Sequence, residues 1–139
     1  MKKLILFLVT VLIFCFNSAQ AKEKAFILFN KHPITNETIK STSNTNEFNS
    51  GERIYYLIGF PEKLYKKSLL IQIFKVGGDK DERFGHEIVW GKRVKLKTQQ
   101  HNFYTDYIVI NQNGVFVMKV YSRDYPTKIL TSANFYVKN

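Results

Sequence analysis

The chain has 139 residues, 45% of them hydrophobic, and its 21 Lys and Arg against 11 Asp and Glu give a formal net charge of +10 at pH 7. This length predicts a single domain, and the lack of any internal repeat or long Gly, Ser or Pro linker excludes a repeat protein. The one cysteine, Cys15, excludes an internal disulfide and a metal site built from several cysteines, so the core must be stable without them.

The N-terminus has the pattern of a secretory signal peptide. Lys2 and Lys3 precede an apolar run at 4–16, which is too short to span a bilayer comfortably. The sequence Ala-Gln-Ala at 19–21 is a small-x-small site of the kind that a signal peptidase accepts. We therefore expect export, with cleavage after Ala21.

The expected organisation is a signal peptide at 1–21 and one mature domain at 22–139, without a transmembrane span. A retained anchor remains an alternative, and so does lipid attachment at Cys15, although the bulky Phe14 before it disfavours that modification. The expected location is the periplasm, the cell surface or the medium. The mature chain keeps 19 Lys and Arg against 11 Asp and Glu, a net charge of +8. This charge favours an anionic partner, or serves solubility alone.

Runs of β-branched and aromatic residues recur along the mature chain between turn residues, which predicts strands. The predicted strands are 25–30, 53–60, 68–76, 86–97, 103–110, 115–122 and 129–137. The polar stretch at 36–51 is expected to be a connection or a weak edge strand. Asn113-Gly114 is typical of a β-hairpin between the fifth and sixth of these predicted strands, 103–110 and 115–122. Because only 62–70 could form a helical turn, the fold class is predicted to be all-β, a single antiparallel β-sandwich of about seven strands.

Alternation within these strands predicts which residues face the core. The expected core residues are Ile71, Ile73, Trp90, Val94, Leu96, Phe116, Met118 and Val120. Ile88 shares the even-numbered row of Trp90 and is expected to be buried with it. The tyrosines on neighbouring positions cannot all face inward, so some of Tyr55, Tyr56, Tyr104, Tyr107 and Tyr121 should be exposed, where their rings could stack on sugars or bases.

The run from Gly114 to Val120 resembles the G-x-Y-x-C-x-V run on strand F of immunoglobulin-like domains. The resemblance extends over 48–139 and implies the sandwich architecture that many secreted bacterial domains share. Phe116 replaces the tyrosine of the pattern and Met118 replaces its disulfide cysteine. The only tryptophan, Trp90, lies one strand later than the family's core tryptophan. A resemblance at this level implies a fold and no activity.

No residue pattern in the chain predicts catalysis or metal binding. The three histidines do not have the spacing of a metal motif: His32, His86 and His101. There is no G-x-S-x-G motif, and the carboxylates at 79–82 are interleaved with cations, as at a solvated loop tip. Asp106, the one acid in the interior of a predicted strand, is expected to point outward. We therefore expect a protein without cofactor, metal or enzymatic activity, and an enzyme with a dispersed active site remains an alternative.

The stretch GKRVKLKT, at 91–98, alternates cations with apolar residues. As a strand it places Arg93, Lys95 and Lys97 on one face, with Lys92 as an additional cation, and the apolar side chains on the other. One interpretation is the wet face of an edge strand, where lysines prevent unwanted pairing. The other is a binding row for an anion.

These features together favour an exported, non-enzymatic interaction module of the cell envelope. The expected partner is an anionic envelope polymer or another envelope protein, and no specific nucleic acid is expected. A structural subunit that adds strands between copies, through a segment such as 25–30, is an alternative. The sequence predicts no particular oligomeric state.

Overall fold

The computed structural model describes residues 24–60, 68–76, 87–96, 102–122 and 128–139, which form eight strands. They are β1 (Phe26–Asn30), β2 (Glu47–Asn49), β3 (Arg53–Gly59), β4 (Ser68–Val76), β5 (Glu87–Lys95), β6 (Phe103–Val109), β7 (Gly114–Ser122) and β8 (Ile129–Lys138). The expected signal peptide, the helical turn expected before β4, the loop at 77–86 and Lys97 lie outside the described residues.

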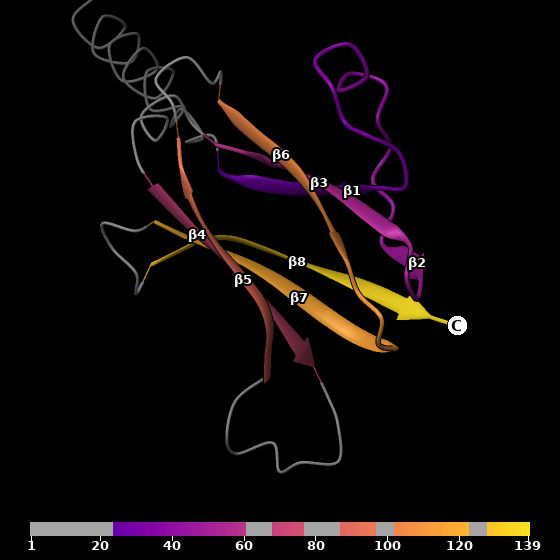
Figure 1. The fold of residues 1–139 in the computed structure, drawn as a ribbon. Coiled ribbons are helices and arrows are strands. Elements are labelled where there is room, and N and C mark those ends of the chain that lie inside the picture. The colour runs from indigo at the N-terminus through magenta and orange to yellow at the C-terminus, as the bar shows by residue number, and fades with distance from the viewer. Residues whose placement is uncertain (1–23, 61–67, 77–86, 97–101, 123–127) are drawn as a thin grey trace, which may run out of the picture.

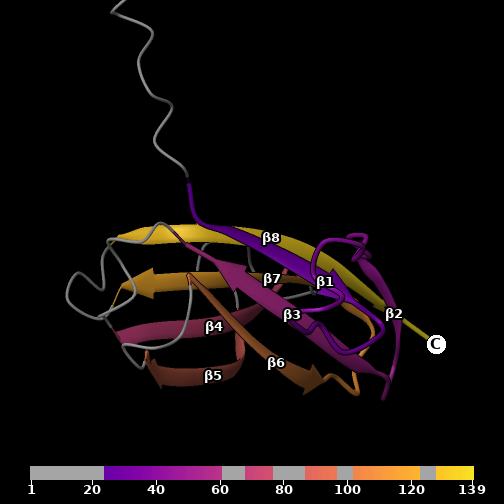
Figure 2. The same cartoon turned by 90° about the horizontal axis from the view of Figure 1, so that it is seen from above.

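The strands form two facing sheets (Figure 1). The three-stranded sheet has the order β1-β3-β6, and the five-stranded sheet has the order β2-β8-β7-β4-β5. Seen from above, β6 runs diagonally across the layer that contains β4 and β5 (Figure 2). All pairings are antiparallel except that of β2 with β8. The predicted all-β sandwich is thus confirmed, and each of the seven predicted strands is present.

The structure has one strand beyond the seven predicted ones. This strand, β2, lies in the polar stretch at 36–51 that was expected to be a connection or a weak edge strand. It has three residues and pairs in parallel with β8, with Phe48 opposite Val137. Phe48 is fully buried. A single apolar side chain therefore anchors β2 to the sandwich, since its two neighbours in the strand are exposed.

The expected hairpin at Asn113-Gly114 is wrong. β6 pairs with β3 in one sheet, whereas β7 pairs with β4 and β8 in the other, so this connection crosses the sandwich. Gly114 has φ of 147°, a conformation that L side chains rarely adopt. A glycine therefore suits this position, where the chain crosses from one sheet to the other. β7 lies between β8 and β4, as strand F lies between strands G and C in immunoglobulin domains.

Aromatic rings fill the centre of the core. The ring centroid of Phe135 lies 5.1 Å from that of Phe29 and 5.5 Å from that of Phe116. Phe48 meets the same ring edge-on at 6.3 Å. Phe116 and Met118, which replace the tyrosine and cysteine of the immunoglobulin pattern, are both fully buried. Apolar packing thus occupies the positions at which that pattern has a hydroxyl and a disulfide.

The predicted core residues are buried except Trp90, which is partly exposed and packs against the edge of the core. The expectation for Ile88 is wrong, because this side chain is 54% exposed. The register shifts between Ile73 and Phe74, which lie opposite Trp90 and Ile88. Val89 is thus an extra residue on β5, and this β-bulge moves Ile88 to the outer face.

Candidate functional site

Arg93 and Lys95 project from the outer face of β5, as the alternation predicted. They lie opposite Leu70 and Ser68 on β4, and both are exposed. Within the described residues neither of them takes part in an ion pair. β5 is the last strand of its sheet, so these two cations lie at a sheet edge. Whether they bind an anion stays a prediction, and the third cation of the row, Lys97, is not described.

Lys92 lies on the opposite face of β5 from Arg93 and Lys95. It pairs in register with Ile71, whose side chain is fully buried, so Lys92 points into the space between the sheets. There it forms an ion pair with Asp106 of β6, which belongs to the other sheet. The structure therefore separates Lys92 from the two outward cations.

The expectation that Asp106 points outward is wrong. Asp106 lies in register with the fully buried Tyr56, on the same side of β6 as Tyr104 and Ile108. The Tyr104 hydroxyl donates a hydrogen bond of 3.0 Å to Asp106 Oδ2, and Lys92 Nζ donates to the same oxygen. This inter-sheet cluster, which we define as Lys92, Tyr104, Asp106 and Tyr56, connects the edge strands of the two sheets.

Electrostatics hold both charged members of the inter-sheet cluster in their ionised forms. Burial alone would raise the pKa of Asp106, but hydrogen bonds from Lys92, from the Tyr107 N–H and from Tyr104 outweigh it and lower this pKa below its usual value. Hydrogen bonding to Asp106 raises the pKa of Lys92. Neither group is therefore ready to exchange a proton near neutral pH, so the geometry suits a structural link better than acid–base chemistry.

Tyr56 completes the inter-sheet cluster from β3. Its ring centroid lies 6.2 Å from that of Tyr104, and burial raises the pKa of its hydroxyl. Among the described residues this buried hydroxyl has no hydrogen-bond partner. Such a group normally bonds to water or protein, so its neighbourhood keeps some polar character inside the sandwich.

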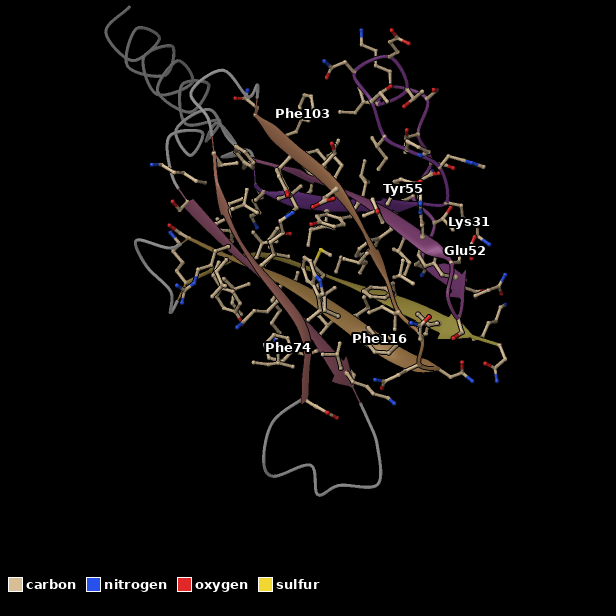
Figure 3. All side chains as sticks on the ribbon, viewed as in Figure 1. Lys31, Glu52, Tyr55, Phe74, Phe103 and Phe116 are labelled. Atoms are coloured by element: carbon tan, nitrogen blue, oxygen red, sulfur yellow. The ribbon has the colours of Figure 1, made fainter. Side chains whose placement is uncertain are left out.

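The outer face of the three-stranded sheet is unusually apolar. Antiparallel sheets of this kind commonly turn polar residues to the solvent. Here the residues of β1, β3 and β6 that alternate with the core residues include only three polar ones, Asn30, Arg53 and Thr105. Five large side chains of this surface form what we call the aromatic face: Phe26, Tyr55, Phe103, Tyr107 and Val109. Figure 3 shows Tyr55 and Phe103 on this sheet, with Phe74 and Phe116 on the other.

Several side chains of the aromatic face are open to solvent. The exposed fractions of Phe26, Tyr107 and Val109 are 47%, 45% and 43%. The Tyr55 and Tyr107 ring centroids are 5.7 Å apart, and the Arg53 guanidinium lies 4.9 Å from the centre of the Tyr107 ring. One end of the face therefore combines paired tyrosines with a cation.

The other end of the aromatic face depends on a glycine. Phe26 lies opposite Gly59 on β3, and a Cβ atom at Gly59 would come within 2.4 Å of the Phe26 ring. Phe103 lies on the other side of the same glycine. Between the two ends, Leu57 is fully buried although it points away from the core. The middle of this surface is therefore closed to solvent at Leu57, and the exposed side chains of the aromatic face lie toward its two ends.

The aromatic face was not predicted from the sequence, although a signal was present. The run RIYYLIGF has apolar residues on both alternations, at Tyr55 and Leu57 as well as at Ile54 and Tyr56. The expectation that some tyrosines face outward is correct: Tyr55 and Tyr107 do, whereas Tyr56 and Tyr104 face inward. Only the register of the sheet brings Phe26, Phe103 and Tyr107 onto one surface.

A hollow of about 420 Å³ lies beside the connection between β1 and β2. Its lining includes the exposed His32, but the hydroxyls of Thr38, Ser41 and Thr42 bond within the loop itself. These three hydroxyls of the lining are therefore already engaged within the loop.

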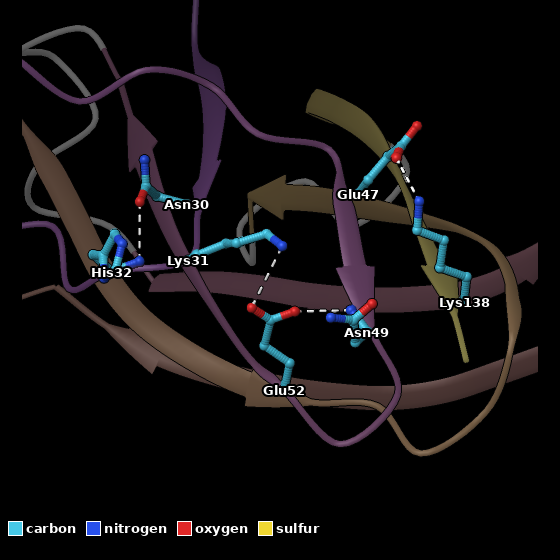
Figure 4. A network of polar contacts seen from close by, with 7 residues as sticks. All are labelled: Asn30, Lys31, His32, Glu47, Asn49, Glu52 and Lys138. Carbon is cyan, nitrogen blue, oxygen red and sulfur yellow. Dashed lines mark hydrogen bonds and ion pairs between the residues drawn. The ribbon is translucent and has the colours of Figure 1, made fainter.

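Exposed ion pairs hold the neighbouring strand ends (Figure 4). Glu52 pairs with Lys31 at 3.7 Å and accepts a hydrogen bond of 2.8 Å from the Asn49 N–H, and Glu47 pairs with Lys138 at 3.0 Å. These contacts are a structural support for β2 and for the turn into β3.

The described residues contain no group of three or more His, Asp or Glu side chains that could hold a metal ion. His86 and His101 lie outside them. In the same part of the chain, no helix is long and apolar enough to cross a membrane.

No family model matches the chain, and no curated protein is significantly similar to it. Solved structures are similar in fold. The soluble domain of PmoD from a Methylocystis species superposes with a TM-score of 0.54 at 14% identity, over 82% of this chain and 90% of that one. An immunoglobulin-like protein from Pseudomonas aeruginosa superposes with a TM-score of 0.50 at 12% identity, over 85% and 99%. The chain therefore has the immunoglobulin-like β-sandwich fold.

Proposed function

We propose that this chain is an exported, non-enzymatic interaction module of the bacterial cell envelope, and that it binds another envelope protein through the aromatic face. The observation that carries the proposal is the composition of that face. Its outward positions include one charged residue, Arg53, in a chain of which 23% is charged. Exposed apolar side chains gathered on one surface mark interaction sites in soluble proteins.

The residue types of the aromatic face suit a protein partner. Tyrosine, phenylalanine and arginine are enriched at the centres of protein interfaces, and truncation of a tyrosine or arginine there often has the largest effect on binding. Tyr107 with Arg53 beside it has this chemistry. Because these side chains stand on paired strands, they lose little freedom on binding.

The envelope location rests on the N-terminal pattern and on the basic charge of the mature chain. The pattern of lysines, apolar run and small-x-small site predicts export. In the envelope, a net charge of +8 attracts a protein with an acidic surface over long range, whereas the aromatic face supplies short-range contact.

The proposal is tested by capture from solubilised envelopes with the exported protein as bait. The substitutions Tyr107→Asp and Phe26→Asp place a charge on the aromatic face, whereas the matched control Asn134→Asp places the same charge on the exposed outer face of the other sheet. We expect one defined protein that wild type and the control retain and that both face variants lose. Equal capture by all four proteins, or no protein above background, would contradict the proposal.

A further inference from the structure

The edge of the five-stranded sheet at β5 is a second surface, separate from the aromatic face. Of the two terminal strands in this sheet, β2 has three residues and β5 has nine. Among the described strands β5 pairs only with β4, so its other side presents backbone N–H and C=O groups. Such an edge can take up an added strand.

We propose that the edge of β5 from Trp90 to Lys95 binds an extended acidic segment of a partner protein by antiparallel strand addition. This inference goes beyond the function proposed above, because it uses a different surface and a different kind of contact. The β-bulge at Val89 ends the regular stretch on one side. The site is therefore about six residues long, the length of an ordinary strand.

The charges on β5 indicate which side chains the added segment should carry. Arg93 and Lys95 lie two residues apart on the outer face, and two residues along a strand span about 6.5 to 7 Å. An added strand has the same period, so acids two residues apart would each lie opposite one cation. Directly opposed charges of unlike sign stabilise strand pairs. Two cations with this spacing match a short acidic strand better than a long polyanion, which gains affinity from many contacts.

Gly91 provides space at the next outward position. A Cβ atom there would find Ile71 O as its nearest neighbour at 3.6 Å, an ordinary contact, so the surface above the glycine is open. A large ring opposite Gly91 could cover this gap, as aromatic residues do beside strand glycines. Read from its N-terminus, an antiparallel segment would have the pattern acid, x, acid, x, aromatic, opposite Lys95, Arg93 and Gly91 in turn.

The two positions marked x in this pattern lie opposite Val94 and Lys92, on the inner face of β5. Val94 is buried at the margin of the core, so an apolar residue opposite it would extend the core. Lys92 is held by Asp106 of the other sheet, so it does not compete for the acids of the segment. The inter-sheet cluster also fixes β5 before any partner arrives, which reduces the entropy lost on binding.

The test titrates a peptide with the core sequence EVETF into the isotope-labelled exported protein at millimolar concentration, followed by amide chemical shifts. We expect shifts concentrated between Trp90 and Lys95. Combined Arg93→Gln and Lys95→Gln substitutions should weaken binding by about 2- to 30-fold, since each opposed pair contributes about 0.2 to 1 kcal/mol. The control double variant, Lys24→Gln with Lys40→Gln, removes equal charge at exposed positions elsewhere and should leave the affinity within about twofold.

Three further peptides separate strand addition from charge attraction: two are N-methylated on alternate sets of amides, and one is scrambled. In an added strand, every second peptide N–H points toward β5 and the others point away from it. N-methylation of the amides that face β5 should abolish binding, whereas N-methylation of the other set should leave binding intact. A scrambled peptide of the same composition should bind more weakly. Absence of shifts at β5 at millimolar peptide, equal effects of both methylated sets, or equal binding of the scrambled peptide or of polyphosphate would overturn the inference. These outcomes leave the aromatic face untested and are distinguishable from failure of the proposed function.

Discussion

Asp106 is a strand residue whose environment comes from both sheets. It accepts hydrogen bonds from Lys92 and Tyr104, and these connect the edges of the two layers. We expect Asp106→Asn to lower the free energy of unfolding by about 1 kcal/mol at pH 7, because the pair is partly exposed and ion pairs of this kind are modest. Chemical denaturation with a single unfolding transition measures this difference.

The pH dependence of the same variant follows from the two pKa shifts. The pKa of Asp106 is lower in the folded than in the unfolded chain, so its stabilisation is present above about pH 4 and lost as the pH falls through the folded value. The pKa of Lys92 is raised, so its contribution is present below about pH 10 and lost at higher pH.

The difference in the free energy of unfolding between wild type and Asp106→Asn should therefore be constant between these limits and shrink below pH 4. Glu47→Gln, at an exposed pair, is the control and should change stability by less than about 0.5 kcal/mol. A difference that persists unchanged at pH 3 would contradict the assignment.

Substitution of Phe116 tests how tightly the core is packed. It is fully buried, and its ring stacks on that of Phe135 at 5.5 Å. Phe116→Ala should destabilise the protein by about 3 to 5 kcal/mol, since it removes apolar burial and leaves a cavity. Tyr136→Ala, at a ring that is 43% exposed, is the matched control and should cost less than about 1 kcal/mol. Comparable losses in the two variants would show that Phe116 is not in the core.

At the scale of elements, local pattern predicted the strands well. Each of the seven predicted runs begins and ends within about two residues of the observed strand, because Gly, Pro and Asn residues bound them. The stretch at 36–51 was left open between a connection and a weak edge strand, because its buried apolar residue, Phe48, gives no periodicity. The structure has a short edge strand there, β2. Two features escaped prediction. The bulge at Val89 lies among apolar residues that suit either register. The crossing after β6 depends on which sheet each strand joins, and Asn113-Gly114 alone does not specify that.

Two glycines in strands should respond differently to the same substitution. Gly114 has φ of 147°, and a Cβ atom there would lie 3.1 Å from Lys75 Cε. Gly114→Ala should therefore destabilise the protein by about 1 to 3 kcal/mol. Gly91→Ala places its Cβ no closer than 3.6 Å to any neighbour outside its own stretch, so its effect should stay within about 0.5 kcal/mol. Thermal or chemical unfolding of the pair of variants decides the matter, and equal losses would refute the role given to the Gly114 backbone.

In the whole molecule, only part of the two candidate binding surfaces could be predicted from the sequence. Alternation predicted that Arg93 and Lys95 face the solvent, because this needs only the period of a strand. It did not predict that Lys92 meets Asp106, since this contact depends on which edges face one another across the sandwich. The aromatic face required the register of β1, β3 and β6, which brings residues from distant parts of the chain together. Surfaces assembled from several strands are thus the part that local pattern misses.

If a protein partner covers the aromatic face, site-specific photo-crosslinking in cells that export the protein detects it most directly. A photoreactive amino acid is placed at Tyr107 or Val109 on the aromatic face, and at the exposed Ser132 on the outer face of the other sheet as the control. We expect one discrete crosslinked species from Tyr107 and Val109 that Ser132 does not give. Crosslinks that are absent at all three positions, or identical at all three, would contradict this expectation.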